Sequence, residues 1–202
     1  MPTTHRKPLL LSLGLLFLSG STPAPHGATA VFAGGCFWGT EYVFEHVRGV
    51  AGVVSGFARE PATGTPAGLP QPVEAVHVTY NADQVSYQQL LEIFFAVAHD
   101  PTTMDRQGPD SGPEYRAVVF AQGGTQVMAA LSYVASLRES KKFSAPIVTQ
   151  IKTLDGFTAA PAEHQDYSFR HLTDAYVVQN DIPKLERLKR EFPALYQETR
   201  AP

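Results

Sequence analysis

The sequence predicts an α/β (α+β) fold, a two-layer sandwich in which helices cover one mixed sheet, with a split βαβ (ferredoxin-like) core and a long irregular C-terminal tail. Two observations support this fold class. Apolar, β-branched runs that are typical of strands alternate with segments of helical periodicity. These segments follow the order strand-helix-strand twice and then add one helix and one strand, which is the split βαβ order with an extension.

The first half of the chain contains three expected strands and one expected helix. The apolar run Val31–Ala33 predicts a strand, and Thr40–Val47 predicts a helix that begins near the cysteine before it. Val50–Phe57 is apolar and β-branched, so we expect a buried strand. Four prolines and two glycines make Ala58–Pro72 a loop. Val73–Tyr80 alternates in character, which is the period of a strand with two different faces.

The second half supplies two more strands and three helices. A Ser-x-x-Gln capping box precedes Tyr87–Ala98, whose apolar residues recur at helical spacing. A polar loop should follow, and then a strand at Tyr115–Phe120, a helix at Thr125–Lys141 and an alternating strand at Ile147–Thr153. The remainder is expected to be irregular except for a short helix at Pro183–Glu191.

The N-terminus has the pattern of a secretory signal peptide, which we place at residues 1–30. Basic residues form a positive n-region, and Leu9–Leu18 is an apolar core too short to cross a bilayer. Ala28-Thr29-Ala30 fits a small-x-small cleavage site, so we expect cleavage near Ala30 and export, to the periplasm of a bacterium. Residues 31–202 would then form a single catalytic domain without stable membrane insertion. An uncleaved anchor is the alternative.

Composition and charge exclude several partners. The formal net charge is −3 and the mature part has no basic run, so neither nucleic acid nor an anionic membrane is an expected partner. The histidines, acids and single cysteine are not spaced like a metal site, and no nucleotide-binding glycine loop occurs. We therefore expect no metal and no cofactor, and we expect the protein to be a monomer.

The only cysteine of the chain, Cys36, and its only tryptophan, Trp38, lie two positions apart between glycines. A thiol in the first turn of a helix is near the positive end of the helix dipole and near unpaired backbone N–H groups. Both effects favour the thiolate, so the pattern predicts a reactive Cys36. The alternative is a small buried side chain without a chemical role.

Glu74 is a second candidate because it shares a strand face with Val76, Val78 and Tyr80. Burial among such neighbours would raise the pKa of the carboxyl and make it a proton donor near neutral pH. The competing interpretation is a strand end that points to solvent.

These residues, together with several other segments, resemble the A-type peptide methionine sulfoxide reductases. The motif Gly35-Cys36-Phe37-Trp38-Gly39 resembles the first signature of that family, and the resemblance covers nearly all of Val31–Tyr196. Further segments match in the same order, namely Val73-Glu74-Ala75-Val76, His99-Asp100-Pro101-Thr102-Thr103, Arg106-Gln107-Gly108, Asp110-x-Gly112-x-x-Tyr115-Arg116, Ala162-Glu163-His164-Gln165, Tyr176-Val177-Val178, Asn180-Asp181, Pro183-Lys184 and Phe192-Pro193.

The resemblance implies reduction of methionine S-sulfoxide, free or in proteins, as repair of oxidative damage. The Cys36 thiolate would attack the sulfoxide sulfur, and protonated Glu74 would deliver a proton to the sulfoxide oxygen. The products would be methionine and a sulfenic acid on Cys36, which a thiol must reduce. Expected partners are therefore oxidised proteins or peptides and a thioredoxin-fold protein or small thiol.

The resemblance also assigns binding roles. Tyr115 would hold the sulfoxide oxygen, and Asp110 would order water in the pocket. Phe37 and Trp38 would enclose the S-methyl group. Without the resemblance, each of these four residues could equally be an ordinary core, turn or strand residue.

The chain departs from the family in two ways. The family usually has a second oxygen-binding tyrosine in the loop at Ala58–Pro72, and this loop has none. We expect weaker transition-state stabilisation, by about 1 to 3 kcal/mol. Many relatives also carry a resolving cysteine, whereas Cys36 is alone, so no internal disulfide can form.

Two other function classes stay open at this point. One is acyl transfer, with Cys36 as nucleophile and His46 or His77 as base, although no triad pattern is recognisable. The other is a catalytically impaired module that binds oxidised methionine, which the altered loop would explain.

Overall fold

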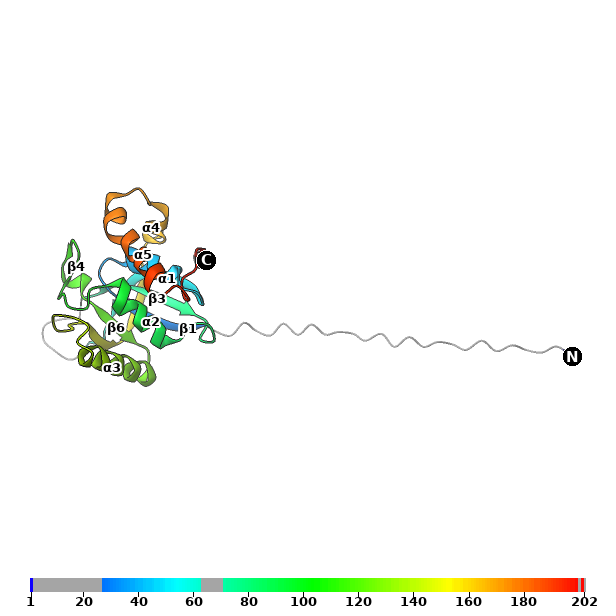
Figure 1. Cartoon of the computed structure of the whole chain (residues 1–202), viewed down its shortest axis with the longest axis horizontal. Helices are drawn as coiled ribbons and strands as arrows, with labels where there is room; N and C mark the ends of the chain where they lie inside the picture. Colours follow the sequence, from blue (N-terminus) through cyan, green and yellow to red (C-terminus); the bar gives the residue numbers. More distant parts are fainter. Residues whose placement is uncertain (2–26, 63–70, 200, 202) are drawn as a thin grey trace.

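The computed structural model describes Met1, residues 27–62 and 71–199, and Ala201 (Figure 1). The strands of its main sheet are β1 (Ala28–Ala33), β2 (Val50–Arg59), β3 (Val73–Tyr80), β6 (Val118–Ala121), β7 (Gln150–Thr153) and β8 (Gly156–Ala159). They pair in the order β7-β6-β1-β3-β2-β8. β6 and β7 are parallel and the other neighbours are antiparallel, so the sheet is mixed, as predicted. Two short strands, β4 (Arg106–Gln107) and β5 (Asp110–Ser111), form a separate hairpin.

Helical segments connect and cover these strands. The α-helices are α1 (Phe37–Glu45), α2 (Tyr87–Ile93), α3 (Gly124–Glu139), α4 (Tyr167–Arg170) and α5 (Ile182–Glu191). The segments η1 (Phe94–Ala98) and η4 (Val177–Asp181) are π-helical, and η2 (Pro113–Tyr115) and η3 (Ala162–His164) are 3₁₀ turns. The capping box predicted before α2 is present, with Ser86 and Gln89 bonding each other's backbone.

The connections interleave two strand-helix-strand units. α1 joins β1 to β2, which lie on either side of β3, and α2 with η1 leads from β3 towards β6, on the other side of β1. The predicted α/β class and mixed sheet are confirmed. The ferredoxin-like core stays a prediction, because β7 and β8 extend the pattern at both edges of the sheet.

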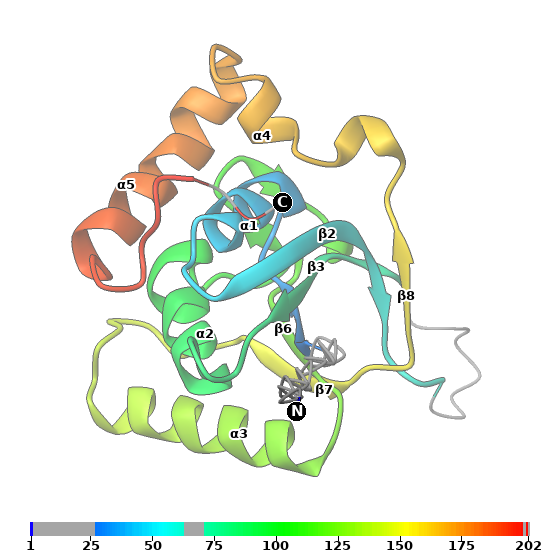
Figure 2. The same cartoon turned by 90° about the vertical axis from the view of Figure 1, so that its right-hand side faces the viewer.

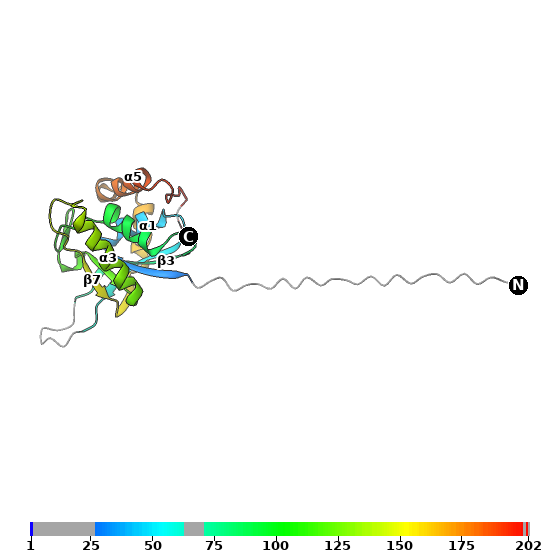
Figure 3. The same cartoon turned by 60° about the horizontal axis from the view of Figure 1, so that its bottom comes forward.

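Helix α1 lies in the middle of the protein. It contacts β2 and β3 on one side and α4, η4 and α5 on the other. Figure 2 shows α1 between α5 and the strands β2 and β3, and Figure 3 shows α5 over the outer side of α1. Every residue of α1 except Trp38 is buried. A helix covered on all sides by packed elements holds its N-terminus in a fixed position.

The two faces of β1 serve two hydrophobic clusters. Phe32 points to the helices, and its ring centroid lies 5.2 Å from that of Phe44 and 4.9 Å from that of Phe94. Val31 points to the opposite face and packs in a smaller cluster with Phe120. This alternation fixes the register of the strand that leads into the cysteine.

The second half of the chain differs from the prediction in two places. Tyr115 ends the turn η2, which begins with Pro113, and the strand starts only at Val118. The tail is less irregular than predicted, because β8 pairs with β2 and three helical segments precede α5. These tail elements are three to five residues long, too short to show a period. Residues 63–70 of the predicted loop lie outside the described residues.

β1 begins at Ala28, inside the predicted cleavage site. Residues 28–30 pair with residues 80–78 of β3, and Ala30 is fully buried. Cleavage after Ala30 would remove the first three of the six residues of β1. Most of the predicted leader, residues 2–26, lies outside the described residues. In the part of the chain that is described, no helix is long and apolar enough to cross a membrane.

Candidate active site

Cys36 lies where β1 ends and α1 begins, as predicted. Gly35 before it has a φ of +88°, a left-handed conformation that favours glycine. A Cβ on Gly35 would lie 2.4 Å from the Cβ of Gln107, and a Cβ on Gly34 would lie 2.9 Å from the Phe94 ring. The two glycines therefore allow the close packing that places Cys36 at the N-cap of α1, where it is a free, partly exposed thiol.

The structure adds an effect that opposes the predicted activation of Cys36 by the helix N-terminus. Burial is the largest influence and raises the pKa of the thiol from 9.0 to about 12, and the Glu74 carboxylate raises it further. Hydrogen bonds from the Trp38 backbone N–H and the Tyr176 hydroxyl oppose this increase in the pKa without cancelling it. The helix N-terminus does contact the sulfur, but desolvation outweighs its effect.

Glu74 lies on β3 beside the first turn of α1. Its Oε2 accepts a hydrogen bond from the Phe37 backbone N–H at 3.1 Å. Burial raises the pKa of the carboxyl from 4.5 to about 7, the Phe37 hydrogen bond lowers it, and the charges of Asp110 and Glu114 raise it. The direction agrees with the sequence prediction, and the side chain does not point into open solvent.

Tyr115 and Asp110 reach the same place from the loop that follows η1. Burial raises the pKa of the Tyr115 hydroxyl to about 12, and the charges of Glu74, Asp110 and Cys36 add to the increase. Tyr115 therefore remains a hydrogen-bond donor at neutral pH. The four polar residues predicted to carry the chemistry lie within one electrostatic neighbourhood.

Tyr176 is a site residue to which sequence analysis assigned no role beyond a matching segment. It directly precedes η4, and its hydroxyl donates a hydrogen bond to Oδ2 of Asp110. The same hydroxyl is a hydrogen-bond partner of the Cys36 sulfur, and burial raises its pKa strongly. One hydroxyl proton can serve only one acceptor at a time, so Tyr176 can turn from Asp110 to the sulfur when a thiolate forms.

The two aromatic residues after the cysteine differ in their surroundings. Phe37 is only 3% exposed and meets Phe57 edge-on at 5.8 Å between ring centroids. Trp38 is partly exposed and stacks on Tyr167, with 3.7 Å between centroids. Tyr176 meets the Trp38 ring edge-on at 5.8 Å. Phe37 and Trp38 thus form a rigid aromatic wall next to Cys36, and the C-terminal segment supports Trp38.

Asp181 is a second residue that sequence analysis did not single out as functional. It is fully buried, accepts a hydrogen bond from Ser168 Oγ at 2.8 Å, and lies 4.0 Å from Lys184 Nζ. Its charge contributes to the raised pKa of Cys36. A Cβ on Gly39 would lie 2.3 Å from Asp181 Oδ1, so the glycine lets this carboxyl approach α1.

A cavity of about 550 Å³ opens beside the thiol. Cys36, Asp110 and Tyr176 contribute to its lining, whereas Glu74 and Tyr115 do not. The lining of the cavity therefore includes the nucleophile but neither the predicted proton donor nor the predicted oxygen ligand.

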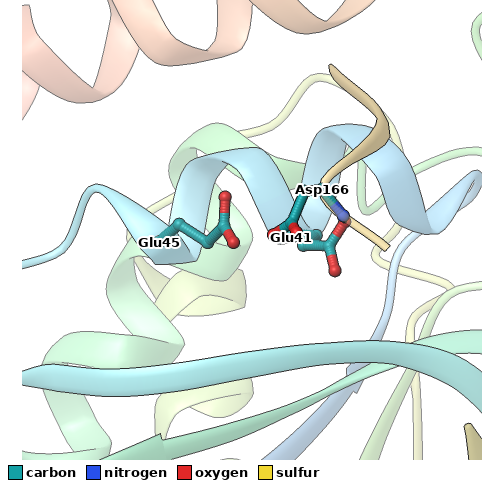
Figure 4. A group of neighbouring side chains, drawn as sticks. All are labelled: Glu41, Glu45 and Asp166. Atoms are coloured by element: carbon teal, nitrogen blue, oxygen red, sulfur yellow. The ribbon is translucent and has the colours of Figure 1, made fainter. Parts of the chain in front are cut away.

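A separate acidic cluster lies further along α1. Glu41, Glu45 and Asp166 have carboxylate oxygens within 4.8 Å of one another (Figure 4). Oε2 of Glu41 accepts a hydrogen bond from the Asp166 backbone N–H at 2.9 Å, across a sequence separation of 125 residues, and burial raises the pKa of Glu41 to about 7. The bond ties α1 to the segment before α4. The absence of a metal stays a prediction.

The two histidines considered as bases occupy other places. His46 is the C-cap of α1, at the opposite end from Cys36, and its Nδ1 bonds the Tyr42 carbonyl at 2.8 Å. His77 lies on the face of β3 opposite to Glu74, with its ring 5.6 Å from that of Phe157. These positions do not favour acyl transfer.

Known proteins match the chain over most of its length. The family described as peptide methionine sulfoxide reductase matches residues 28–195. A peptide methionine sulfoxide reductase MsrA 2 from Mesorhizobium japonicum is 46% identical over 180 residues, covering 87% of this chain and 92% of the relative.

Solved structures agree in fold. Mxr1 from Saccharomyces cerevisiae in its reduced form is 25% identical, with a TM-score of 0.65, and the match covers 77% of this chain and 92% of that one. Methionine sulfoxide reductase A of Corynebacterium diphtheriae is 27% identical, with a TM-score of 0.62 and 75% and 78% coverage. Mxr1 has also been solved in complex with Trx2, at 22% identity and a TM-score of 0.52.

Proposed function

This chain belongs to the A-type peptide methionine sulfoxide reductases, and we propose that it reduces the S epimer of methionine sulfoxide, free or in proteins, with Cys36 as the nucleophile. The observation that carries the proposal is the contact between Glu74 and the first turn of α1, where the Phe37 N–H holds the carboxyl near the thiol. Breaking a sulfur–oxygen bond requires a nucleophile for the sulfur and a proton for the oxygen. The two groups supply these side by side.

The reaction begins with a proton transfer within this pair. Above pH 7 the resting site holds a thiol on Cys36 and a carboxylate on Glu74, because the thiol has the higher pKa. Transfer of the thiol proton to Glu74 creates the thiolate and the acid together. The thiolate attacks the sulfoxide sulfur while Glu74 protonates the oxygen and Tyr115 donates a hydrogen bond to it.

The oxygen then passes to Cys36, and methionine leaves. Sulfoxide sulfur is reduced by two electrons, and Cys36 is oxidised by two electrons to the sulfenic acid. During the attack, Tyr176 and the Trp38 backbone N–H stabilise the sulfur as hydrogen-bond donors. Phe37 and Trp38 enclose the methyl group, which selects methionine sulfoxide over more polar sulfoxides.

A thiol from another molecule must restore Cys36, because the chain has one cysteine. The complex of yeast Mxr1 with Trx2 supports a thioredoxin-fold protein in this role. A small thiol can perform the same chemistry, since attack on sulfenic acid needs only a thiolate with access to the sulfur. The physiological outcome is repair of methionine oxidised in proteins.

A single-turnover experiment tests the proposal. Reduced protein is mixed with an S-sulfoxide peptide without reductant, and both methionine and the mass of the protein are measured. We expect one methionine per protein and one added oxygen on Cys36, no reaction in Cys36→Ser, and a rate lower by about 10²- to 10⁴-fold in Glu74→Gln. Glu92→Gln on α2 is the control. Binding without methionine formation in the wild type would favour the binding module instead.

We also propose that the residues before Ala28 are an export leader and that the protein acts in the bacterial periplasm. The cut should fall before Ala28 rather than after Ala30, because residues 28–30 pair with β3. The intact mass and N-terminal sequence of the exported protein measure the position. Recovery of a stable protein that begins at Val31 would contradict the revised site.

A further inference from the structure

The proposed function requires a second thiol to reach Cys36 after methionine has left, and the present inference rests on that function. The hydroxyl of the sulfenic acid starts on the side of the sulfur that faced Glu74 and Tyr115, because the sulfoxide oxygen is transferred there. Displacement at a divalent sulfur proceeds in line with the leaving group. The incoming thiol must therefore approach the sulfur from another side.

The cavity beside Cys36 provides such an approach. It is lined by Cys36 but not by Glu74 or Tyr115, so a molecule inside it can contact the sulfur without displacing the two groups that faced the oxygen. Its volume of about 550 Å³ falls in the range of small-molecule sites. The remaining walls come from η1 and the loop after it, from residues 143–144, from residues 176–180 and from α5.

Two cations on α5 give one wall of the cavity its chemical character. The side chains of Lys184 and Arg187 are 24% and 44% exposed. Arg187 bonds Glu191 through Nε at 2.8 Å, and within the described residues its terminal nitrogens make no hydrogen bond. Lys184 has one weak ion pair, at 4.0 Å, with Asp181. An ammonium and a guanidinium in a partly buried cavity are suited to a carboxylate.

The carboxylates in the lining are already engaged by neighbours. Asp110 accepts from Tyr176, and Oδ1 of Asp100 accepts from both the backbone and the hydroxyl of Thr102, at 2.9 and 2.6 Å. Among the described residues, neither of them forms an ion pair with Lys184 or Arg187.

We propose that this cavity binds a small thiol that carries a carboxylate, with Lys184 and Arg187 holding the carboxylate and the thiol directed at Cys36. The thiolate attacks the Cys36 sulfur, the S–S bond forms, the S–O bond breaks, and the hydroxide takes a proton and leaves as water. A second molecule of the thiol attacks the mixed disulfide. It releases the Cys36 thiol, after protonation, and the disulfide of the small thiol.

The second half-reaction can be measured alone. The sulfenic acid is formed with one equivalent of sulfoxide, methionine is quantified and removed, and the protein is mixed with 3-mercaptopropionate, 2-mercaptoethanol or cysteamine. These thiols are anionic, neutral and cationic. We compare the wild type with Arg187→Gln, Lys184→Gln and the control Arg190→Gln, which removes the same charge from α5 at an exposed position outside the cavity lining.

We expect Arg187→Gln and Lys184→Gln to slow reduction by 3-mercaptopropionate about three- to tenfold, to leave 2-mercaptoethanol unchanged, and to leave the cysteamine rate equal or higher. For each thiol, the rate with a variant is divided by the rate with the wild type, so the intrinsic reactivity of the thiol cancels. Equal slowing with all three thiols, or the same slowing in Arg190→Gln, would overturn the proposal.

Two other results would also overturn it. Slower reduction by a thioredoxin-fold protein alone would assign the cations to a protein partner. A higher KM for sulfoxide in the variants would assign the cavity to methionine sulfoxide. Failure of the proposed function is distinguishable, because it appears earlier, as absence of methionine before any thiol is added.

Discussion

The reaction of Cys36 with sulfoxide should become independent of pH above about pH 7, and Glu74→Gln should restore a dependence. At rest the carboxyl, with a pKa of about 7, loses its proton before the thiol, with a pKa of about 12. The reactive form has the proton on Glu74 and the charge on Cys36. It holds as many protons as the resting form between these two pKa values, so its fraction is constant there. Below pH 7 both groups are protonated, and the rate should fall about tenfold per pH unit.

The separation of the two pKa values sets the magnitude. Moving the proton from Cys36 to Glu74 costs at most about 7 kcal/mol. The cost is lower in practice, since protonation of Glu74 removes the charge that is the second-largest cause of the raised thiol pKa. In Glu74→Gln the thiol must ionise to solvent instead. Its rate should therefore rise about tenfold per pH unit between roughly pH 7 and pH 9.

Stopped-flow single-turnover measurement of methionine formation, from about pH 5.5 to 9.5 at constant ionic strength, gives both profiles. The wild type should reach a plateau where the variant is still rising. A wild-type rate that falls above pH 7 would refute the reasoning, because it would show a thiolate that forms below the pKa of Glu74. A wild-type rate that rises throughout would show that Glu74 does not accept the thiol proton.

Three further predictions follow from individual contacts. Tyr176→Phe should raise the pKa of the Cys36 thiol, which thiolate absorbance measures. It should raise the barrier to methionine formation by roughly 1 to 3 kcal/mol and leave the free energy of unfolding unchanged within about 1 kcal/mol. An unaltered rate would remove Tyr176 from the site. Gly39→Ala should lower the free energy of unfolding by about 1 to 3 kcal/mol because its Cβ meets Asp181, whereas Gly124→Ala, with nothing within 4 Å, should not destabilise; equal urea midpoints would contradict the clash. Glu41 binds its proton more tightly when folded, so its contribution to stability is lost as the pH rises from about 4.5 to 7, by up to about 3 kcal/mol. Glu41→Gln should flatten that decline in urea unfolding, and an identical slope would disprove the assignment.

Sequence patterns were sufficient to single out Cys36 and Glu74 as candidates, and the structure places them side by side. Cys36 follows a turn that the two glycines before it predict. Glu74 lies on a strand of eight residues whose two faces clearly alternate in character. The position of Cys36 at the start of a helix reveals only one of the influences on the thiol pKa, and burial outweighs it. The Tyr176 hydroxyl lowers that pKa through a hydrogen bond, and the Asp181 charge raises it. Both residues come from short tail elements with no period to reveal them.

The fold shows the same division. Long strands and helices were predicted close to their observed bounds, whereas β8 and the turn at Tyr115 were not. Ala28–Ala30 satisfies both a cleavage pattern and a strand edge, because both accept small residues. Only the pairing with β3 distinguishes them, and there Ala30 lies opposite Val78, 48 residues further along the chain.

Because the C-terminal segment lies over α1, two kinds of opening differ in this protein: global unfolding, and release of this segment alone. Amides inside α1 are enclosed on all sides and should exchange with solvent only on global unfolding. The segment at 162–181 is joined to the rest by hydrogen bonds of Gln165 with the Ser55 backbone and of the Asp166 backbone with Glu41, and by the stacking of Tyr167 on Trp38. Its release alone would uncover Cys36 and withdraw the burial that keeps the thiol protonated. Beyond the access that the cavity already gives, the sensitivity of the thiol to oxidants and alkylating agents therefore depends on a local equilibrium, which amide exchange in this segment measures, rather than on the stability of the domain.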